Sequence, residues 1–125
     1  MRQTLIFAAI QMAFSIGIRQ NAWKLSNKLD RTEIQIKDEF LQYVEPATEM
    51  FEVAEEMAME KPPKAAIMFY EEIGNWWASF CRDNGHFPER EATLAGMAEI
   101  VQAVFNNTLS HTQRDALAKR LKDFK

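Results

Sequence analysis

The sequence predicts an all-α fold: a single domain over residues 1–125, folded as an antiparallel bundle of five to six helices. Four glycines and four prolines leave little material for tight turns, which favours a few long elements. Apolar residues recur three and four positions apart along most of the chain, the period of an amphipathic helix. A length of 125 residues suits one domain, and 47% apolar with 26% charged residues is ordinary for a globular protein.

Residues 2–29 predict one long helix that is apolar almost all round between residues 5 and 18. This run is shorter than the roughly 20 apolar residues of a transmembrane span. Arg2 and the apolar run resemble a signal peptide, but Ser15-Ile16-Gly17 is a poor cleavage site. We therefore expect a helix buried on all sides, by its own domain or by a second copy in a homodimer.

A second helix is expected from residue 30 to residue 45, and a third follows it to about residue 60. Asp30-Arg-Thr-Glu33 resembles a capping box, and Pro46 breaks or kinks the chain. A short strand over residues 32–37 would lack a partner strand. The residues expected to face the core are Ile36, Phe40, Tyr43 and Val44 in the second helix, and Met50, Phe51, Ala54, Met57 and Ala58 in the third.

The segment from residue 63 to residue 85 predicts the helix around which the others pack. Pro63 suits a first helical position, because its missing N–H would be unpaired there in any case. Asn84-Gly85 marks the end by supplying a residue that tolerates positive φ. The expected core stripe is Ala66, Phe69, Ile73, Trp76 and Phe80, widened on one side by Tyr70, Trp77 and Cys81. We expect Cys81 to serve as a small buried hydrophobic residue.

Two more helices complete the bundle. Pro88 opens the first, whose initial turn carries acidic residues that suit the helix dipole, and Asn106-Asn107 closes it. Ser110-His-Thr-Gln113 resembles a capping box for the last helix. The expected core positions are Leu94, Met97, Ile100, Val101, Val104 and Phe105 in one helix, and Leu117, Leu121 and Phe124 in the other.

Acidic residues concentrate between residues 30 and 60, where ten Asp and Glu accompany two basic residues, a net charge of −8. Glu52, Glu56 and Glu60 are four apart and are expected to stack on one helix face. Like charges at this spacing disfavour each other by about 0.2–0.5 kcal/mol per pair. Three interpretations remain open: a solvated face, a divalent-metal site, or a surface for a basic partner.

The metal interpretation rests on two short motifs on consecutive helices. Glu52-Val-Ala-Glu55-Glu56 and Glu72-Ile-Gly-Asn75 together resemble the paired acidic motifs of all-α nucleoside triphosphate pyrophosphohydrolases of the MazG type. The resemblance covers residues 52–75 and implies that these carboxylates, with Asn75, hold Mg²⁺ against nucleotide phosphates. The chain departs from that pattern at Asn75, where the family has Asp, and at Glu60, which follows Glu56 by four residues instead of three. The resemblance therefore implies a hydrolase, active or degenerate, as the alternative function.

The residues that other catalytic or metal sites require do not occur in this sequence in the necessary patterns. A carboxylate-bridged di-iron bundle uses Glu-x-x-His within helices, whereas His86 is expected in a turn and His111 at a helix start. No Gly-rich phosphate loop, Ser/His/Asp set or Cys/His cluster occurs. The last two helices look like a helix-turn-helix, but a net charge of −3 argues against nucleic acid as the main partner.

The leading hypothesis is a small non-enzymatic regulatory or inhibitor protein that binds another protein, with no catalytic residue, metal or cofactor. A single cysteine demands no oxidising compartment, which fits a cytoplasmic protein. Methionine suits adaptable binding surfaces and tryptophan is a common anchor. The residues expected to contact the partner, through an apolar helix face and the acidic surface, are Glu49, Glu52, Glu56, Glu60, Met59, Met68 and Trp77.

Overall fold

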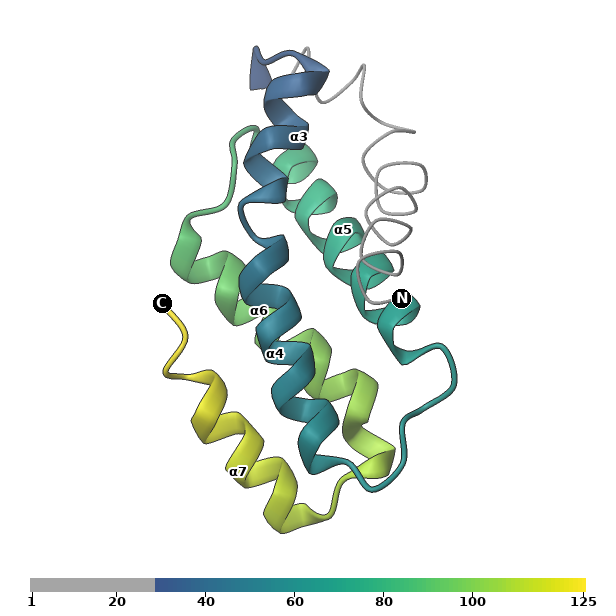
Figure 1. Ribbon diagram of the computed structural model, residues 1–125. Helices are drawn as coiled ribbons and strands as arrows, with labels where there is room; N and C mark the ends of the chain where they lie inside the picture. Colours follow the sequence, from purple (N-terminus) through teal and green to yellow (C-terminus); the bar gives the residue numbers. More distant parts are fainter. Residues whose placement is uncertain (1–28) are drawn as a thin grey trace.

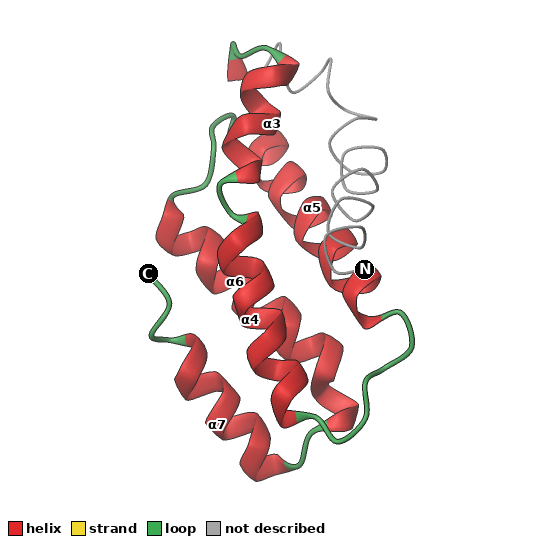
Figure 2. Cartoon of the chain, in the orientation of Figure 1, coloured by secondary structure: helices red, strands yellow, loops and turns green. Residues whose placement is uncertain are grey.

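A computed structural model describes residues 29–125 of the chain. The predicted first helix, and the homodimer contact expected of it, lie outside the described residues. The elements are α3 (Glu33–Leu41), α4 (Val44–Met57), α5 (Ala65–Asn84), α6 (Arg90–Phe105), the 3₁₀ turn η3 (Asn106–Thr108) and α7 (His111–Leu121) (Figure 1). No strand occurs in this part of the chain (Figure 2), which confirms the all-α prediction.

Four helices, α4 to α7, pack against one another, so the predicted bundle of five to six helices is wrong for the described residues. α6 lies at the centre and contacts α4, α5 and α7. In Figure 1 the chain runs down α4, up α5, down α6 and up α7. α3, with nine residues, is too short to pack along this group, although its Ile36 and Phe40 are buried in the core.

The break between α3 and α4 falls earlier than Pro46. α3 ends at Leu41, α4 begins at Val44, and Pro46 lies in the first turn of α4. A proline ring clashes with the carbonyl four residues before it, here that of Gln42, so one helix cannot pass through this point. In a first turn the missing N–H loses no hydrogen bond. The predicted end at residue 45 therefore lies four residues beyond the observed one.

The buried side of α5 is rotated relative to the predicted stripe. Trp77 and Cys81, expected at its flank, are completely buried, whereas Trp76 and Phe80 are half-buried. The cause is packing on the flank: aromatic rings of α3 and of the α5–α6 connection lie against Trp77, at centroid distances of 5.4 Å from both Phe40 and Phe87. Cys81 is buried in the core, which confirms its expected role as a small buried hydrophobic residue, and burial raises the pKa of its thiol to about 12.

The helix ends show which capping predictions succeed. Gly85 ends α5 with φ of 75°, and its N–H donates to the carbonyl of Cys81 at 2.9 Å, as predicted. The capping box of Ser110 and Gln113 at α7 is also confirmed. At α3 the box is formed by Thr32 and Gln35, two residues after the pair that was predicted, because Asp30 adopts a left-handed conformation.

The start of α5 differs from the prediction as well. The helix begins at Ala65, and Lys64 before it is left-handed, with φ of 58°. Pro63 is therefore not the first helical residue. The left-handed conformation costs a residue with a Cβ atom about 1–2 kcal/mol, so Lys64 carries local strain that turns the chain into α5.

Replacing Lys64 with glycine should raise the free energy of unfolding by roughly 0.5–1 kcal/mol, because the relieved strain exceeds the entropy that glycine adds to the unfolded chain. Urea unfolding of the variant measures this change. Glu60→Gly is the matched control, since Glu60 lies in the same connection with φ that is not positive, and it should lower stability. Equal effects of both substitutions would contradict the assignment of strain to Lys64.

Gly96 allows α6 to lie against Trp76. A Cβ atom at Gly96 would stand 2.8 Å from two ring atoms of Trp76, closer than van der Waals contact permits. We expect Gly96→Ala to destabilise the protein by about 1 kcal/mol. Overpacking costs about 1–3 kcal/mol, and the better helix propensity of alanine offsets about 1 kcal/mol of this cost.

The effect of Gly96→Ala on the free energy of unfolding should change sign once the ring of Trp76 is removed. In a Trp76→Leu background, Gly96→Ala should stabilise the protein, since only the propensity gain remains. Thermal and urea unfolding of the four variants in this cycle measure the coupling. Additive effects of the two substitutions would show that Gly96 is not required by Trp76.

Candidate protein-interaction surface

Four carboxylates form a row along the solvent side of α4. Glu45, Glu49, Glu52 and Glu56 follow one another at spacings of four, three and four residues, which places them on one side of the helix. The opposite side enters the core through Ala47, Met50, Phe51 and Ala54. Three of the carboxylate residues are exposed and Glu52 is half-buried. We refer to these four residues as the acidic row.

The last carboxylate of the acidic row, that of Glu56, is disfavoured by the helix that carries it. Glu45 suits the first turn, but the row continues into the last turn of α4, where no basic residue occurs. The negative end of the helix dipole disfavours Glu56 there by about 0.3–1 kcal/mol. The negative charge of Glu55, beside the row, is compensated by Lys61, whose Nζ lies 3.1 Å from Oε2 of Glu55. The charge of Glu56 therefore reduces the local stability of the helix, whereas that of Glu45 adds to it.

Glu60 does not continue the row. α4 ends at Met57 and Ala58 is extended, with ψ of 132°, so Glu60 lies in the connection to α5. The prediction that Glu60 stacks on Glu56 and Glu52 is wrong. Pro62-Pro63 prevents the helix from running on through this connection into α5.

The three apolar residues expected to contact a partner lie in different environments. Met59 is 92% exposed in the connection after α4, and Met68 is 46% exposed near the start of α5. Both side chains are accessible to another molecule. Trp77 is 0% exposed, so it packs the core and presents no surface that could anchor a partner.

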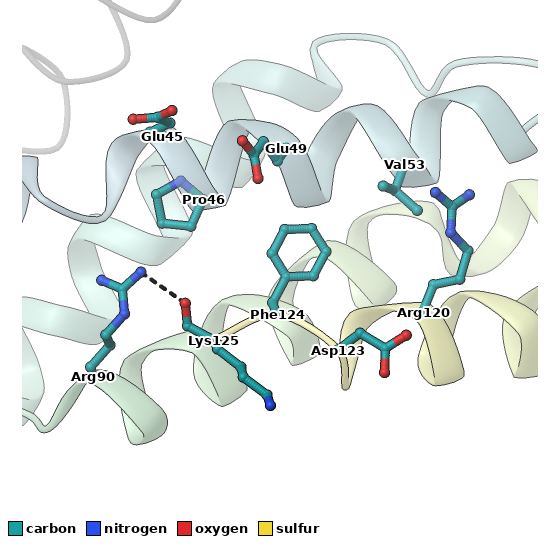
Figure 3. Close-up of a pocket in the computed structure, with 9 residues that line it drawn as sticks. All are labelled: Glu45, Pro46, Glu49, Val53, Arg90, Arg120, Asp123, Phe124 and Lys125. Atoms are coloured by element: carbon teal, nitrogen blue, oxygen red, sulfur yellow. Dashed lines mark hydrogen bonds between the residues drawn. The ribbon is translucent and has the colours of Figure 1, made fainter.

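A groove between α4 and α7 was not predicted from the sequence (Figure 3). It has a volume of about 550 Å³, with acidic residues on the α4 side and both basic residues and Asp123 on the α7 side. Glu45 and Glu49 of the acidic row lie along α4, and Arg120 and Lys125 lie on the side of α7 and the chain after it. Phe124 points between them toward α4 (Figure 3). The groove thus joins half of the acidic row to an apolar side chain.

Hydrogen bonds hold the two sides of this groove in place. At one end, Nη2 of Arg90 donates to the main-chain oxygen of Lys125 at 3.0 Å, and its guanidinium lies 5.9 Å from the ring centroid of Tyr43. Toward the other end of α7, Nε2 of Gln113 donates to the carbonyl of Met57 at 3.0 Å. Buried Leu117 and Leu121 fix α7 between these ties. The groove is therefore largely formed before anything binds.

The residues proposed as metal ligands do not lie close together. Within residues 29–125, no three His, Cys, Asp or Glu side chains lie close enough to hold a metal ion. Glu52, Glu55, Glu56, Glu72 and Asn75 all fall in this range. Glu72 is exposed on the side of α5 away from buried Tyr70 and Trp77. The carboxylates of the two motifs therefore point to different surroundings, and the convergence that a hydrolase of this type requires is not found.

No protein-family model, curated protein or solved structure matches this chain. Among residues 29–125, no helix combines the length and the apolar character needed to cross a bilayer.

Mg²⁺ or Mn²⁺ together with nucleoside triphosphates should leave the unfolding temperature unchanged, because a ligand stabilises a protein only if it binds the folded state. A thermal-shift screen with metal alone, nucleotide alone and both together measures this. Glu72→Ala should behave as the wild type in every condition. A rise that needs metal and nucleotide together, and disappears in Glu72→Ala, would instead favour the hydrolase.

Proposed function

We propose that this chain is a small non-enzymatic protein that binds another protein bearing a basic surface, through the acidic row of α4 and the adjoining α4–α7 groove. The observation that carries this proposal is the persistence of the row into the last turn of α4, where the helix dipole and like-charge spacing both disfavour it. Local rules of stability are broken most often where a surface serves function.

The overall charge of the described part supports a basic partner. The whole chain carries −3, and residues 1–28 hold four basic and no acidic residues, so residues 29–125 carry −7. Exposed acidic surface of this kind attracts a basic protein and accelerates its association, in a manner that salt weakens. Arg120 of α7 and Lys125 after it offer less to a polyanion, because they line the same groove as Glu45 and Glu49.

Apolar residues beside the row supply the anchors that charge alone does not. Phe124 and Val53 line the α4–α7 groove, and Met59 stands exposed just beyond the other end of the row. A segment that fits this surface presents basic side chains toward the acidic row and an apolar side chain toward Phe124. Interfaces commonly combine such an apolar centre with a charged rim. A regulatory or inhibitory role in the cytoplasm, with Cys81 kept reduced in the core, is part of the proposal.

Glu56→Lys should make the protein more stable and a poorer binder at the same time. We expect the free energy of unfolding to rise by about 0.5–1 kcal/mol, because lysine suits the end of α4 and a repulsive pair with Glu52 is lost. Glu45→Lys, at the other end of the same row, should lower it. Urea unfolding of both variants measures the difference, and a stability loss in Glu56→Lys would contradict the electrostatic argument.

Binding is tested in cells that produce the protein, with the photo-crosslinking residue p-benzoylphenylalanine in place of exposed Met59. We expect a discrete covalent adduct with another protein, reduced at least about tenfold by Glu49→Lys with Glu56→Lys. The control places the same residue at Ala103, an exposed position on α6, and should give no such adduct. Equal adducts at both positions, or an adduct insensitive to the two lysines, would refute the proposed surface.

A further inference from the structure

A second groove runs along the other side of α7, between that helix and α6. Its volume is about 960 Å³. Leu94, Ala95 and Ala98 line it from α6, and Ala118 and Leu121 line it from α7. Ala95 is exposed and the alanines at 98 and 118 are half-buried. The centre of this face is therefore apolar and built from small side chains, which let another helix approach closely.

The two edges of this groove carry opposite charges. Glu91 and Glu99 line the α6 side, and Lys122 and Lys125 line the α7 side. All four residues are exposed. Arg90 is the basic exception on α6, but its guanidinium is held over Tyr43 and bonded to the main-chain oxygen of Lys125. The face is thus apolar in the middle, negative along one helix and positive along the other.

A face of this kind is complementary to itself. In an isologous dimer, a two-fold axis brings the same patch of both copies together, so each residue meets the partner's opposite half. A rotation by 180° about an axis that runs along the groove places the basic edge beside α7 of one copy over the acidic edge of α6 of the other. We propose that the α6–α7 groove is the interface of a homodimer in solution, occupied by a second copy of this chain.

The rotation also indicates which charges meet. Lys122 lies toward the end of the groove where α7 finishes and α6 begins, and Glu91 lies at the same end, whereas Glu99 lies toward the other end. Because the axis runs along the groove, each end of one copy meets the same end of the other, so Lys122 of one copy meets Glu91 of the other. Within the described part of the chain, neither residue takes part in an ion pair, so each is available for this contact. The pair occurs twice in the dimer.

The test uses the full chain in a concentration series, with mass measured by sedimentation velocity and light scattering. The wild type should show a dimer of twice the 14.5 kDa chain mass. Glu91→Lys and Lys122→Glu should each weaken dimerisation at least about tenfold in Kd, because like charges then face each other twice. The double variant should recover most of the loss, since the pair is restored with reversed signs.

Controls separate this face from others. Glu72→Lys reverses an exposed charge on α5, outside the groove, and should leave the dimer unchanged. Thermal unfolding of every variant establishes that its fold is intact. A strict monomer at all concentrations overturns the proposal. A dimer that none of the substitutions affects also overturns it and points to residues 1–28, and single variants that weaken the dimer without recovery in the double variant refute the two-fold pairing.

Discussion

One aromatic cluster ties the three largest helices together. Phe51 of α4 meets Phe69 of α5 with 5.6 Å between ring centroids and Phe105 of α6 with 5.3 Å. Rings at such distances attract beyond the area that they bury. Because Phe51 must point inward, the opposite side of α4 must face solvent, and the acidic row has no other place to lie. The position of the candidate surface therefore follows from the packing of a single side chain on the far side of the same helix.

Trp77 shows a different constraint at the other end of the core. Its ring is completely buried against Phe40 and Phe87, yet its Nε1 donates to nothing, and it is the one such buried side-chain atom in the described part. An unpaired buried donor costs about 1–3 kcal/mol. Burial of a whole indole exceeds this loss, since truncation of a core tryptophan to alanine typically costs about 3–5 kcal/mol. Packing at this position thus outweighs hydrogen bonding, and the tryptophan serves the core and not a partner.

Local patterns predicted what depends on local geometry. The helical class, the Gly85 cap and the Ser110 box depend on a few neighbouring residues and were right. The phase of α5 was wrong, because apolar residues at 69, 70, 73, 76, 77, 80 and 81 fit two overlapping stripes and only neighbouring helices choose between them. The α4–α7 groove escaped prediction for a related reason. Leu117 and Leu121 predict that α7 has an inner side, but nothing in their spacing says which helices receive it.

Because of the position of α7, one half of the acidic row lines the α4–α7 groove and the other half lies beyond it. Glu45 and Glu49 line the groove together with Lys125, and Arg120 lies farther along it, beside Val53 (Figure 3). Glu56 lies at the far end of the row, next to the connection that carries Glu60 and the exposed Met59. A basic protein that binds this surface is drawn by charge to the carboxylates of the row, among them Glu56, and gains apolar contacts along the groove. Salt should then slow the association that the Glu56 end promotes. It should weaken the contacts around Phe124 less, since apolar burial is insensitive to screening.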